Sequence, residues 1–273
     1  MSVKLIVTDL DGTFFENDHQ TISKRNIEAF KTAHEMGIKT AIASGRTKSL
    51  TGYALNQVPF IDYLITSNGA AAYGLQSGEL LATNLMDSDS TFKALSILKD
   101  YSAPFEVYCD GKCYIESAFA VNYDKLPIPP HFRQILKENA IPVDSISGLL
   151  KGKCAEKINI MCIEPAGRPE LERELRKIGD VYITSSITEN LEINHYNANK
   201  GYAVKRLCEL LNFSRGEIMC FGDGENDTEM LEYADLSYAM ANGCDKAKQS
   251  AKHIAPPNCE SGVGETIFKI LGR

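Results

Sequence analysis

The sequence lacks the features that mark membrane-spanning and secreted proteins. No apolar stretch is long enough to cross a bilayer, and the apolar residues near the N-terminus stop at Asp9 without a cleavage-like segment. The eight cysteines are scattered and include no Cys-x-x-Cys pair, the spacing typical of zinc and redox sites. We therefore expect a cytoplasmic protein with no membrane span and no signal peptide, whose cysteines are buried thiols rather than disulfides.

Positive charge is also scarce. The chain has 29 Lys and Arg residues against 36 Asp and Glu residues, so its formal net charge is −7. Nucleic acids and anionic membrane surfaces bind basic surfaces, and we expect neither as a partner. The apolar content of 44% and the charged content of 24% are ordinary for a globular protein, and 273 residues suit one large domain or two smaller ones.

The first recognisable feature of the chain is an apolar run that ends in two carboxylates. Leu5 to Thr8 have the composition of a buried strand, and Asp9, Asp11 and Gly12 follow directly. Residues i and i+2 of an extended chain point the same way, so the two acids can face one pocket. The alternative is that this stretch forms only a turn, because Asp and Gly also favour turns.

Strand and helix patterns then alternate, which is typical of a doubly wound, parallel α/β sheet. Within the helix expected at 200–211, the apolar spacing predicts that Val204, Leu207, Leu210 and Leu211 face inward. The expected elements of this kind are a helix capped by Ser23 and stopped by Gly37, strands 38–43 and 63–66, helix 47–55, helix 200–211, strand 217–222, helix 227–233, strand 236–240 and helix 265–271.

The middle of the chain has a different character. Residues 105–116 have the pattern of a β-hairpin, with Asp110 and Gly111 as a two-residue turn. Helices are expected near 90–101 and 168–178, and strands near 158–163 and 181–185. We therefore expect an α+β module at residues 83–188, inserted into a core formed by residues 1–82 and 189–273.

Polar residues gather where the expected strands and helices of the core begin or end. Ligands of open α/β sheets bind beyond the carboxyl ends of the strands, so these clusters are expected to meet. Carboxylates that lie close together are tolerated mainly around a divalent cation, and oxygen ligands suit Mg²⁺. A lysine and a hydroxyl beside that metal can hold a phosphoryl group, although each taken singly is better explained as a surface lysine or as a helix cap. The clusters are Asp9 with Asp11, Ser44 with Gly45, Lys200, and Asp223 to Asp227.

In their order along the chain, these clusters resemble the four motifs of the haloacid dehalogenase (HAD) superfamily. The large insert after the second motif resembles the Cof-type branch of sugar phosphatases with a type IIB cap. The resemblance implies a Rossmann-like core, with the inserted module as the cap, and it covers nearly the whole chain. The motifs are Asp9-Leu10-Asp11-Gly12-Thr13, Ser44-Gly45-Arg46, Lys200-Gly201 and Gly222-Asp223-Gly224-Glu225-Asn226-Asp227, with further likeness at Ser67-Asn68-Gly69-Ala70 and at 258–264.

The resemblance implies catalytic roles for the first pair of acids. Asp9 would be the nucleophile that accepts the phosphoryl group as an aspartyl-phosphate, and Asp11 would be the general acid and then the general base. Mg²⁺ would be bound by Asp9, by Asp223 and by the main-chain carbonyl of Asp11. An ordinary Asp has a pKa of ~3.9, so the site has to raise the pKa of Asp11 while Asp9 stays ionised.

The remaining motif positions are implied to bind the phosphoryl group. Ser44 and the amides of Leu10 and Gly45 would hold its oxygens, Lys200 would neutralise their charge, and Asn226 would donate a further hydrogen bond.

Three further positions keep open roles. Asp227 either supports the metal ligands from behind or orients Lys200. Arg46 either meets the substrate or braces the core, and Thr13 would support the metal ligands.

The resulting hypothesis is a Mg²⁺-dependent phosphatase that acts on a small phosphorylated metabolite, with sugar phosphates as the first candidates. Two alternatives remain, a phosphosugar mutase on the same core and a non-catalytic sensor of a phosphorylated ligand. A monomer or a weak homodimer is expected, and substrate identity is expected to depend on residues 83–188, where the sequence shows no recognisable motif.

Overall fold

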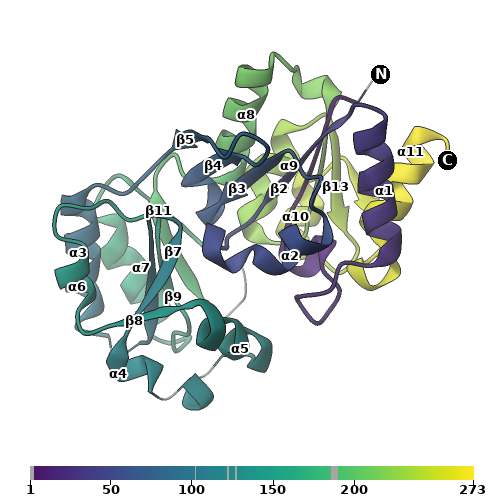
Figure 1. The fold of residues 1–273 in the computed structure, drawn as a ribbon. Coiled ribbons are helices and arrows are strands. Elements are labelled where there is room, and N and C mark those ends of the chain that lie inside the picture. Colours follow the sequence, from purple (N-terminus) through teal and green to yellow (C-terminus); the bar gives the residue numbers. More distant parts are fainter. Residues whose placement is uncertain (1–2, 102, 122, 127, 186–189) are drawn as a thin grey trace.

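Two β-sheets, of eight and six strands, form the framework of the molecule (Figure 1). The structure is a computed structural model that describes residues 3–101, 103–121, 123–126, 128–185 and 190–273. The larger sheet takes strands from both ends of the chain, and the smaller sheet takes the strands between Phe105 and His195. The mixed α/β class with a parallel sheet, predicted from the sequence, is confirmed.

The larger sheet is parallel over six neighbouring strands, in the order β14-β13-β12-β1-β2-β3, and ends in the antiparallel strands β4 and β5. The most apolar strand, β1, lies near its middle, and Thr8 at its end is opposite both Phe221 and Ile42. This register brings the residues that follow β1 and β12 to the same point of the sheet edge. The strands are β1 (Leu5–Thr8), β2 (Lys39–Ala43), β3 (Tyr63–Thr66), β4 (Ala71–Gly74), β5 (Leu80–Thr83), β12 (Ile218–Gly222), β13 (Leu236–Met240) and β14 (His253–Ala255).

Alternation along β1 explains why helices cover both faces of this sheet. Ile6 packs into one apolar cluster with Phe30 of α1, whereas Leu5 and Val7 pack into another with Val204 of α8. The first face is covered by α1 (Lys24–Glu35), α2 (Gly52–Gln57) and α11 (Gly262–Leu271), and the second by α8 (Lys200–Leu211) and α9 (Thr228–Tyr233), with α10 (Asp245–Ser250) against α9.

The cap predicted for α1 and the bounds and inward face predicted for α8 can be compared with the structure. Ser23 caps α1 as predicted, because its hydroxyl accepts a hydrogen bond from the Asn26 amide at 3.2 Å. The bounds of α8 are also confirmed, but the prediction that Leu210 faces inward is wrong, since this side chain is 52% exposed. The buried stripe of α8 runs along Val204 and Leu207, and Leu210 lies beside it.

The smaller sheet has the order β10-β11-β9-β6-β7-β8 and is antiparallel except between β7 and β8. The predicted hairpin is confirmed: β6 and β7 pair across a turn in which Asp110 and Gly111 have φ angles of 53° and 73°. Positive φ at both positions is what the common two-residue hairpin turn requires. The strands are β6 (Phe105–Cys109), β7 (Lys112–Glu116), β8 (Ile141–Val143), β9 (Lys157–Ile160), β10 (Val181–Thr184) and β11 (Leu191–His195).

One face of the smaller sheet is apolar and covered by helices, and its other face is turned toward the larger sheet and its helices (Figure 1). α3 (Ser88–Leu98), α6 (Ile146–Leu149) and α7 (Arg168–Arg176) cover the apolar face, while α4 (Ser117–Ala120) and α5 (Pro130–Asn139) lie beside the other. The division at residues 83 and 188 stays a prediction. Since β11 still pairs in the smaller sheet, we propose that the chain returns to the core after His195.

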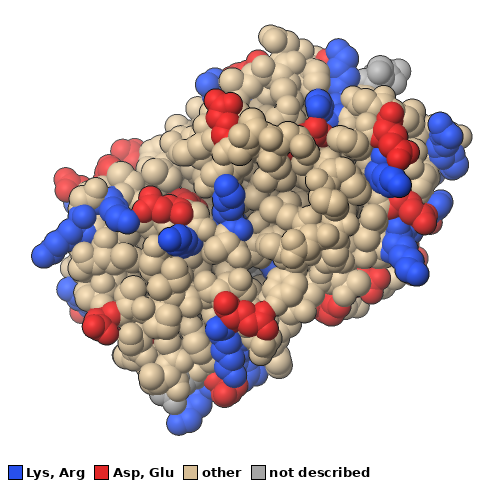
Figure 2. Space-filling model, in the orientation of Figure 1, with Lys and Arg blue, Asp and Glu red and all other residues tan. Residues whose placement is uncertain are grey.

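The outer surface is mixed in charge. On the face drawn in Figure 2, described Lys and Arg side chains are scattered among Asp and Glu side chains. None of the helices in the described ranges is both long and apolar enough to cross a membrane.

A buried amide on α1 generates a stability prediction. Asn26 is fully buried; its Nδ2 donates to the Phe14 carbonyl at 3.2 Å, and its Oδ1 accepts from the Gly264 amide at 2.8 Å. Asn26→Ala leaves both backbone groups buried and unpaired, so we expect a loss of about 2–4 kcal/mol in the free energy of unfolding, measured by urea denaturation. The control is Asn56→Ala on the exposed side of α2, with an expected change within about 0.5 kcal/mol. Equal stability of the two variants would contradict the role of Asn26.

Candidate active site

The pairing of β1 with β12 places two predicted site residues side by side. The Asp9 amide continues this pairing with a 3.0 Å hydrogen bond to the Phe221 carbonyl, and Asp223 follows β12 one residue beyond Gly222. The predicted motifs at these two strand ends therefore meet, as the strand order requires.

Lys200 connects three of the polar clusters. It begins α8 and is fully buried, and its Nζ donates to Asp9 Oδ1 at 2.6 Å and to Asp227 Oδ1 at 2.7 Å. The other Asp227 oxygen accepts from the backbone amides of Asp223 and Gly224, each at 2.9 Å. Burial by itself would lower the pKa of Lys200, but Asp227 and Asp9 outweigh it and raise the pKa, so the ammonium form is favoured.

Three carboxylates near this lysine form a group that can hold a cation. Oxygens of Asp9, Asp223 and Asp227 all lie within 4.8 Å of one another. Burial, the largest influence, raises the pKa of Asp9 well above its ordinary value, and the neighbouring carboxylates add to the rise against the effect of Lys200. Burial and then the charge of Asp227 likewise raise the pKa of Asp223. This surplus of buried negative charge is what a divalent cation with oxygen ligands would relieve.

Close packing against Gly12 and a hydrogen bond from Thr13 fix the side chain of Asp223. Gly12 has a φ of +79°, and a Cβ atom at this position would lie 2.3 Å from Asp223 Oδ2, so only glycine fits. The neighbouring Thr13 hydroxyl donates to Asp223 Oδ1 at 2.7 Å. Thr13 thus contacts a carboxylate of the cluster, and Asp227 contacts both Lys200 and the cluster, so the structure is compatible with both roles predicted for Asp227.

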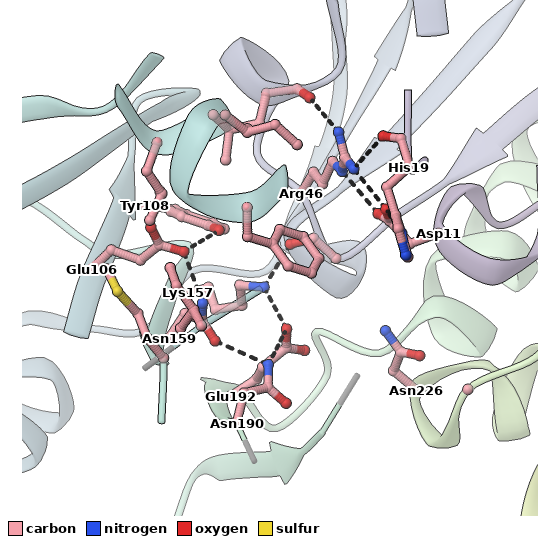
Figure 3. A pocket seen from close by; sticks show the side chains of 18 of the residues that line it. Asp11, His19, Arg46, Glu106, Tyr108, Lys157, Asn159, Asn190, Glu192 and Asn226 are labelled. Carbon is pink, nitrogen blue, oxygen red and sulfur yellow. Dashed lines mark hydrogen bonds and ion pairs between the residues drawn. The ribbon is translucent and has the colours of Figure 1, made fainter. Parts of the chain in front are cut away.

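The Asp11 carboxylate is held by a clamp formed by Arg46 and His19 (Figure 3). Arg46 Nε donates to Asp11 Oδ2 at 2.8 Å, its second nitrogen donates to Oδ1 at 2.6 Å, and His19 Nδ1 lies 2.9 Å from Oδ1. Burial would raise the pKa of Asp11, but the charge of Arg46 and the hydrogen bonds from His19 and Arg46 hold it well below its usual range.

The predicted rise in the pKa of Asp11 is therefore contradicted, because the pKa of Asp11 is lowered while that of Asp9 is raised. That Asp9 stays ionised beside a bound metal ion stays a prediction. The physical reason is the distribution of positive charge. Arg46 pairs with Asp11 alone, while Asp9 shares Lys200 with Asp227.

Of the five predicted phosphate-binding residues, Lys200 is the buried lysine that binds Asp9 and Asp227, and the other four divide into two groups. Gly45 and Asn226 line the same cavity as Asp9 and Asp11, between the larger sheet and the smaller one (Figure 3). Leu10 and Ser44 are buried, with exposed fractions of 0% and 1%, and the Ser44 hydroxyl accepts from the Arg46 amide at 3.1 Å. Their proposed contacts to a phosphoryl group stay predictions.

Sequence reasoning missed the polar face of the smaller sheet. The strand register sets Glu106, Asn159 and Glu192 in one row across β6, β9 and β11, and Tyr108, Lys157 and Asn194 in the next. The signal is present in the sequence, since apolar residues alternate with these positions in each strand. Alternation marks a polar face but does not show that it is buried, as it is here for Glu106, Lys157 and Glu192 at 3%, 1% and 2% exposure.

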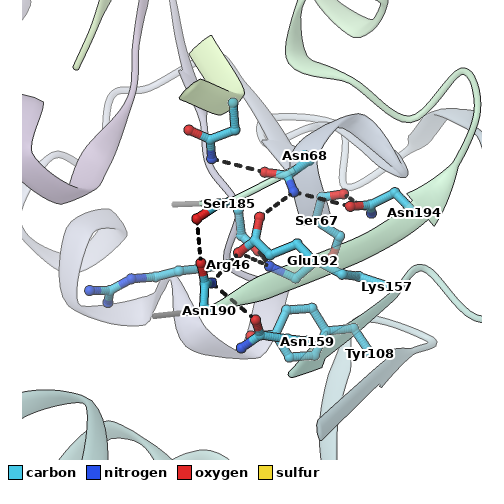
Figure 4. Close-up of polar contacts among 12 residues, drawn as sticks. Arg46, Ser67, Asn68, Tyr108, Lys157, Asn159, Ser185, Asn190, Glu192 and Asn194 are labelled. Carbon is cyan, nitrogen blue, oxygen red and sulfur yellow. Dashed lines mark hydrogen bonds and ion pairs between the residues drawn. The ribbon is translucent and has the colours of Figure 1, made fainter. Parts of the chain in front are cut away.

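This polar face is joined to the core by hydrogen bonds through Asn68 (Figure 4). Asn68 Nδ2 donates to Glu192 Oε2 at 2.7 Å and to Asn194 Oδ1 at 3.1 Å, and its Oδ1 accepts from Asn226 Nδ2 at 3.1 Å. Lys157 Nζ donates to the Gly45 carbonyl at 2.6 Å. The two units therefore contact each other through residues that adjoin the predicted phosphate site.

A stack of two histidines lies beside the cavity, which His19 lines. His19 of the core stacks on His131 of α5, with ring centroids 4.1 Å apart and planes 3° apart. His131 Nε2 is buried and has no hydrogen-bond partner among the described residues. Burial, followed by the charge of His19, lowers the pKa of His131 to about 4.

Comparison with known proteins gives a single family, and two of the relatives are named as phosphatases. A family model described as haloacid dehalogenase-like hydrolase matches residues 6–267. The chain is 30% identical to the putative phosphatase MG265 of Mycoplasma genitalium, over 99% of both chains. It is 28% identical to 5-amino-6-(5-phospho-D-ribitylamino)uracil phosphatase YcsE of Bacillus subtilis, over 98% of this chain and 95% of that protein.

Solved structures show the same fold. A haloacid dehalogenase-like hydrolase from B. subtilis superposes with a TM-score of 0.85 at 25% identity, covering 97% of this chain and 99% of that one. The HAD subclass IIB sugar phosphatase BT4131 superposes with a TM-score of 0.84 at 22% identity, covering 99% of each chain.

The His19–His131 stack generates a pH prediction. An unfolded histidine has a pKa near ~6.5, so between about pH 6.5 and pH 4 the unfolded chain binds a proton that folded His131 does not. Its contribution to stability is therefore complete above this window and declines as the pH falls through it. We expect His131→Phe, which keeps a stacked ring, to flatten the loss of thermal stability over this window, measured by melting temperature against pH. His34→Gln, at an exposed position on α1, is the control, and a slope as steep in His131→Phe as in the parent would contradict the assignment.

Proposed function

Because the chain belongs to the haloacid dehalogenase-like hydrolases and is a phosphoric monoester hydrolase, we propose that it uses Mg²⁺ and an aspartyl-phosphate to hydrolyse small phosphorylated metabolites. Sugar phosphates are the proposed substrate class. The name of YcsE describes a phosphate on a ribityl chain, and BT4131 is a sugar phosphatase of the same fold. A phosphorylated ribityl chain and a sugar phosphate are both hydroxylated phosphate monoesters, which supports this substrate class.

The observation that carries the proposal is the position of Asp9 in the cavity. Its Oδ1 is held by Lys200, and among the hydrogen bonds of the described residues none uses its Oδ2. One oxygen of this cavity-lining residue is thus held by Lys200 while the other is not used in a hydrogen bond within the described ranges, an arrangement that suits a nucleophile. Beside it, Gly45 and Asn226 line the space that a phosphoryl group would occupy.

The proposed reaction has two balanced steps. In the first, Asp9 Oδ2 attacks phosphorus, the bond from phosphorus to the leaving oxygen breaks, and Asp11 gives that oxygen a proton. In the second, Asp11 takes a proton from water as the water oxygen attacks phosphorus, and Asp9 is released with inorganic phosphate. Lys200, paired with both Asp9 and Asp227, keeps the nucleophile oriented throughout.

The clamp on Asp11 sets a condition on this mechanism. With Arg46 and His19 bound to it, Asp11 is ionised and ready to act as a base, not as an acid. We propose that a bound substrate shifts Arg46 away from Asp11 and that the Asp11 carboxylate then takes up a proton from the solvent. Asp11 passes this proton to the leaving oxygen as the bond from that oxygen to phosphorus breaks. Arg46 thereby acts on the catalytic acid, a role that neither of its two predicted alternatives describes.

The carboxylate cluster fits Mg²⁺ because its donor atoms are oxygens and because the negative charge of three carboxylates exceeds the single positive charge of Lys200. Asp9 and Asp223 would hold the ion, with the Asp11 carbonyl as the further predicted ligand and Asp227 and Thr13 behind them. Once bound, it would neutralise the carboxylates and the phosphoryl oxygens.

A cytoplasmic location is proposed as well, since the buried thiols of Cys109, Cys113, Cys208 and Cys220 are free. A monomer or weak homodimer stays a prediction.

The nucleophile assignment is tested by Asp9→Asn. Because an amide cannot form the phosphorylated intermediate, we expect the rate of phosphate release from p-nitrophenyl phosphate to fall by about 10⁴-fold or more. Asp89→Asn, which makes the same change at an exposed site on α3, should retain activity. Retained turnover in the Asp9 variant would exclude Asp9 as the nucleophile, and product analysis with a sugar 1-phosphate separates hydrolysis from transfer to another hydroxyl.

Metal binding is tested without turnover. Mg²⁺ at about 100 times its dissociation constant should stabilise the fold by about 2.7 kcal/mol, seen as a rise in melting temperature that EDTA reverses. Asp223→Asn should abolish most of this rise, because it removes one of the clustered carboxylates. Sodium chloride at equal ionic strength is the control, and an equal rise in both salts would count against a specific site.

A further inference from the structure

The cavity beyond the phosphate site has two unlike walls. On one wall, apolar side chains from α5 and its surroundings face the space, among them Ile128, Phe132, Leu136 and Met161. The opposite wall is the buried polar face of the smaller sheet, with Glu106, Asn159 and Glu192 in one row (Figure 3). A group that fills this space therefore needs an apolar side and a hydrogen-bonding side.

Carboxylates and amides dominate the polar wall. Glu106 Oε1 accepts from the Tyr108 hydroxyl and from Asn159 Nδ2, both at 2.7 Å, and its Oε2 accepts from the Cys113 thiol at 3.2 Å. All three donors are uncharged, and Glu106 has no cationic partner within the described part of the chain. A buried carboxylate of this kind attracts hydroxyl or ammonium donors and repels anions.

The cations that line the cavity are already engaged. Arg46 holds Asp11 with two hydrogen bonds and also donates to the His19 carbonyl at 3.0 Å. Lys157 Nζ donates to Glu192 Oε1 at 2.9 Å and to the Gly45 carbonyl at 2.6 Å, and stands 4.8 Å from the Tyr108 ring centre (Figure 4). The ammonium group thus makes two hydrogen bonds, one of them in an ion pair with Glu192, and one contact with an aromatic ring. Apart from His19, which stacks on His131, the described lining offers no further cation, and residues 1–2, 102, 122, 127 and 186–189 include no Lys, Arg or His.

We infer that this cavity selects a leaving group without negative charge, that is, a hydroxylated or amine-bearing group with one apolar side. The inference rests on the proposed function, because it concerns the part of the substrate that remains after the phosphoryl group is removed. A second phosphate or a carboxylate on that part would face Glu106 and Glu192 and find no unengaged cation. The Lys157–Glu192 ion pair is the element that enforces this, since Glu192 neutralises the one ammonium of the polar wall.

The test compares two substrates that differ in one group. Sorbitol 6-phosphate and 6-phosphogluconate share chain length and hydroxyl pattern, but a carboxylate replaces the terminal CH₂OH of sorbitol in the second. We expect the wild-type protein to favour sorbitol 6-phosphate by about tenfold or more in kcat/KM. Glu192→Gln leaves the Lys157 charge unneutralised and should narrow this ratio by about tenfold, mainly by improving the anionic substrate.

Two variants keep the test decisive. Glu156→Gln makes the same change at a neighbouring buried carboxylate that binds Thr47 and Ser67 and does not line the cavity, so its ratio should stay near that of the wild type. Lys157→Gln combined with Glu192→Gln removes both charges without leaving one of them unpaired in the interior, and it should keep the preference for the neutral substrate. A wild-type ratio near one, or equal shifts in Glu192→Gln and Glu156→Gln, would overturn the inference.

Binding measurements separate this inference from the proposed function. Isothermal titration of both phosphates into the Asp9→Asn protein with Mg²⁺ requires no turnover, and we expect the same preference of about tenfold in the dissociation constants. Equal dissociation constants would overturn the inference. A preference in binding combined with no phosphate release by the wild-type protein would support the inference about charge and overturn the proposed reaction instead.

Discussion

The burial of the Lys200 ammonium between Asp9 and Asp227 is the interaction on which the site depends. A fully buried ammonium is tolerated only when it is paired and hydrogen-bonded, so these three side chains fix one another. They come from the end of β1, the start of α8 and the turn after β12. Because Asp227 also binds the amides of Asp223 and Gly224, the same contact positions the proposed metal ligand. The strength of these ion pairs depends on the surrounding core, which buries Lys200 and Asp227 completely and Asp9 nearly so.

Much of the core could be predicted because its signals are local. The apolar run of β1, the Ser23 cap and the stripe of α8 each act within a few residues, and the strand order then decides which ends meet. The Arg46–Asp11 pair could not be predicted in this way. It joins positions 35 residues apart, and the resulting pKa shift has the opposite sign to the one that the chemistry suggested. Charge placement is a property of the folded arrangement and not of a motif.

The polar face of the smaller sheet illustrates a second limit. Alternation along β9 and β11 shows which side of each strand is polar, but it is the same for a face that meets water and a face that meets another protein surface. Here Glu156, Lys157 and Asn194 are buried against the core, because loops after β2 and β3 supply matching hydrogen bonds. Nothing in a single strand encodes that match. The fold therefore follows from local pattern, whereas the cavity depends on how two polar surfaces fit.

The backbone conformation and the hydrogen bonds of Asn68 together restrict which residues position 68 can carry. Asn68 has a φ of 59°, a left-handed conformation that Gly, Asn and Asp tolerate best. Its side chain must also donate to Glu192 and Asn194 and accept from Asn226 at the same time. Glycine has no side chain and aspartate cannot donate, so asparagine alone meets both demands. An asparagine at this position is thus a short sequence marker for relatives that seat the smaller sheet on the core in the same way.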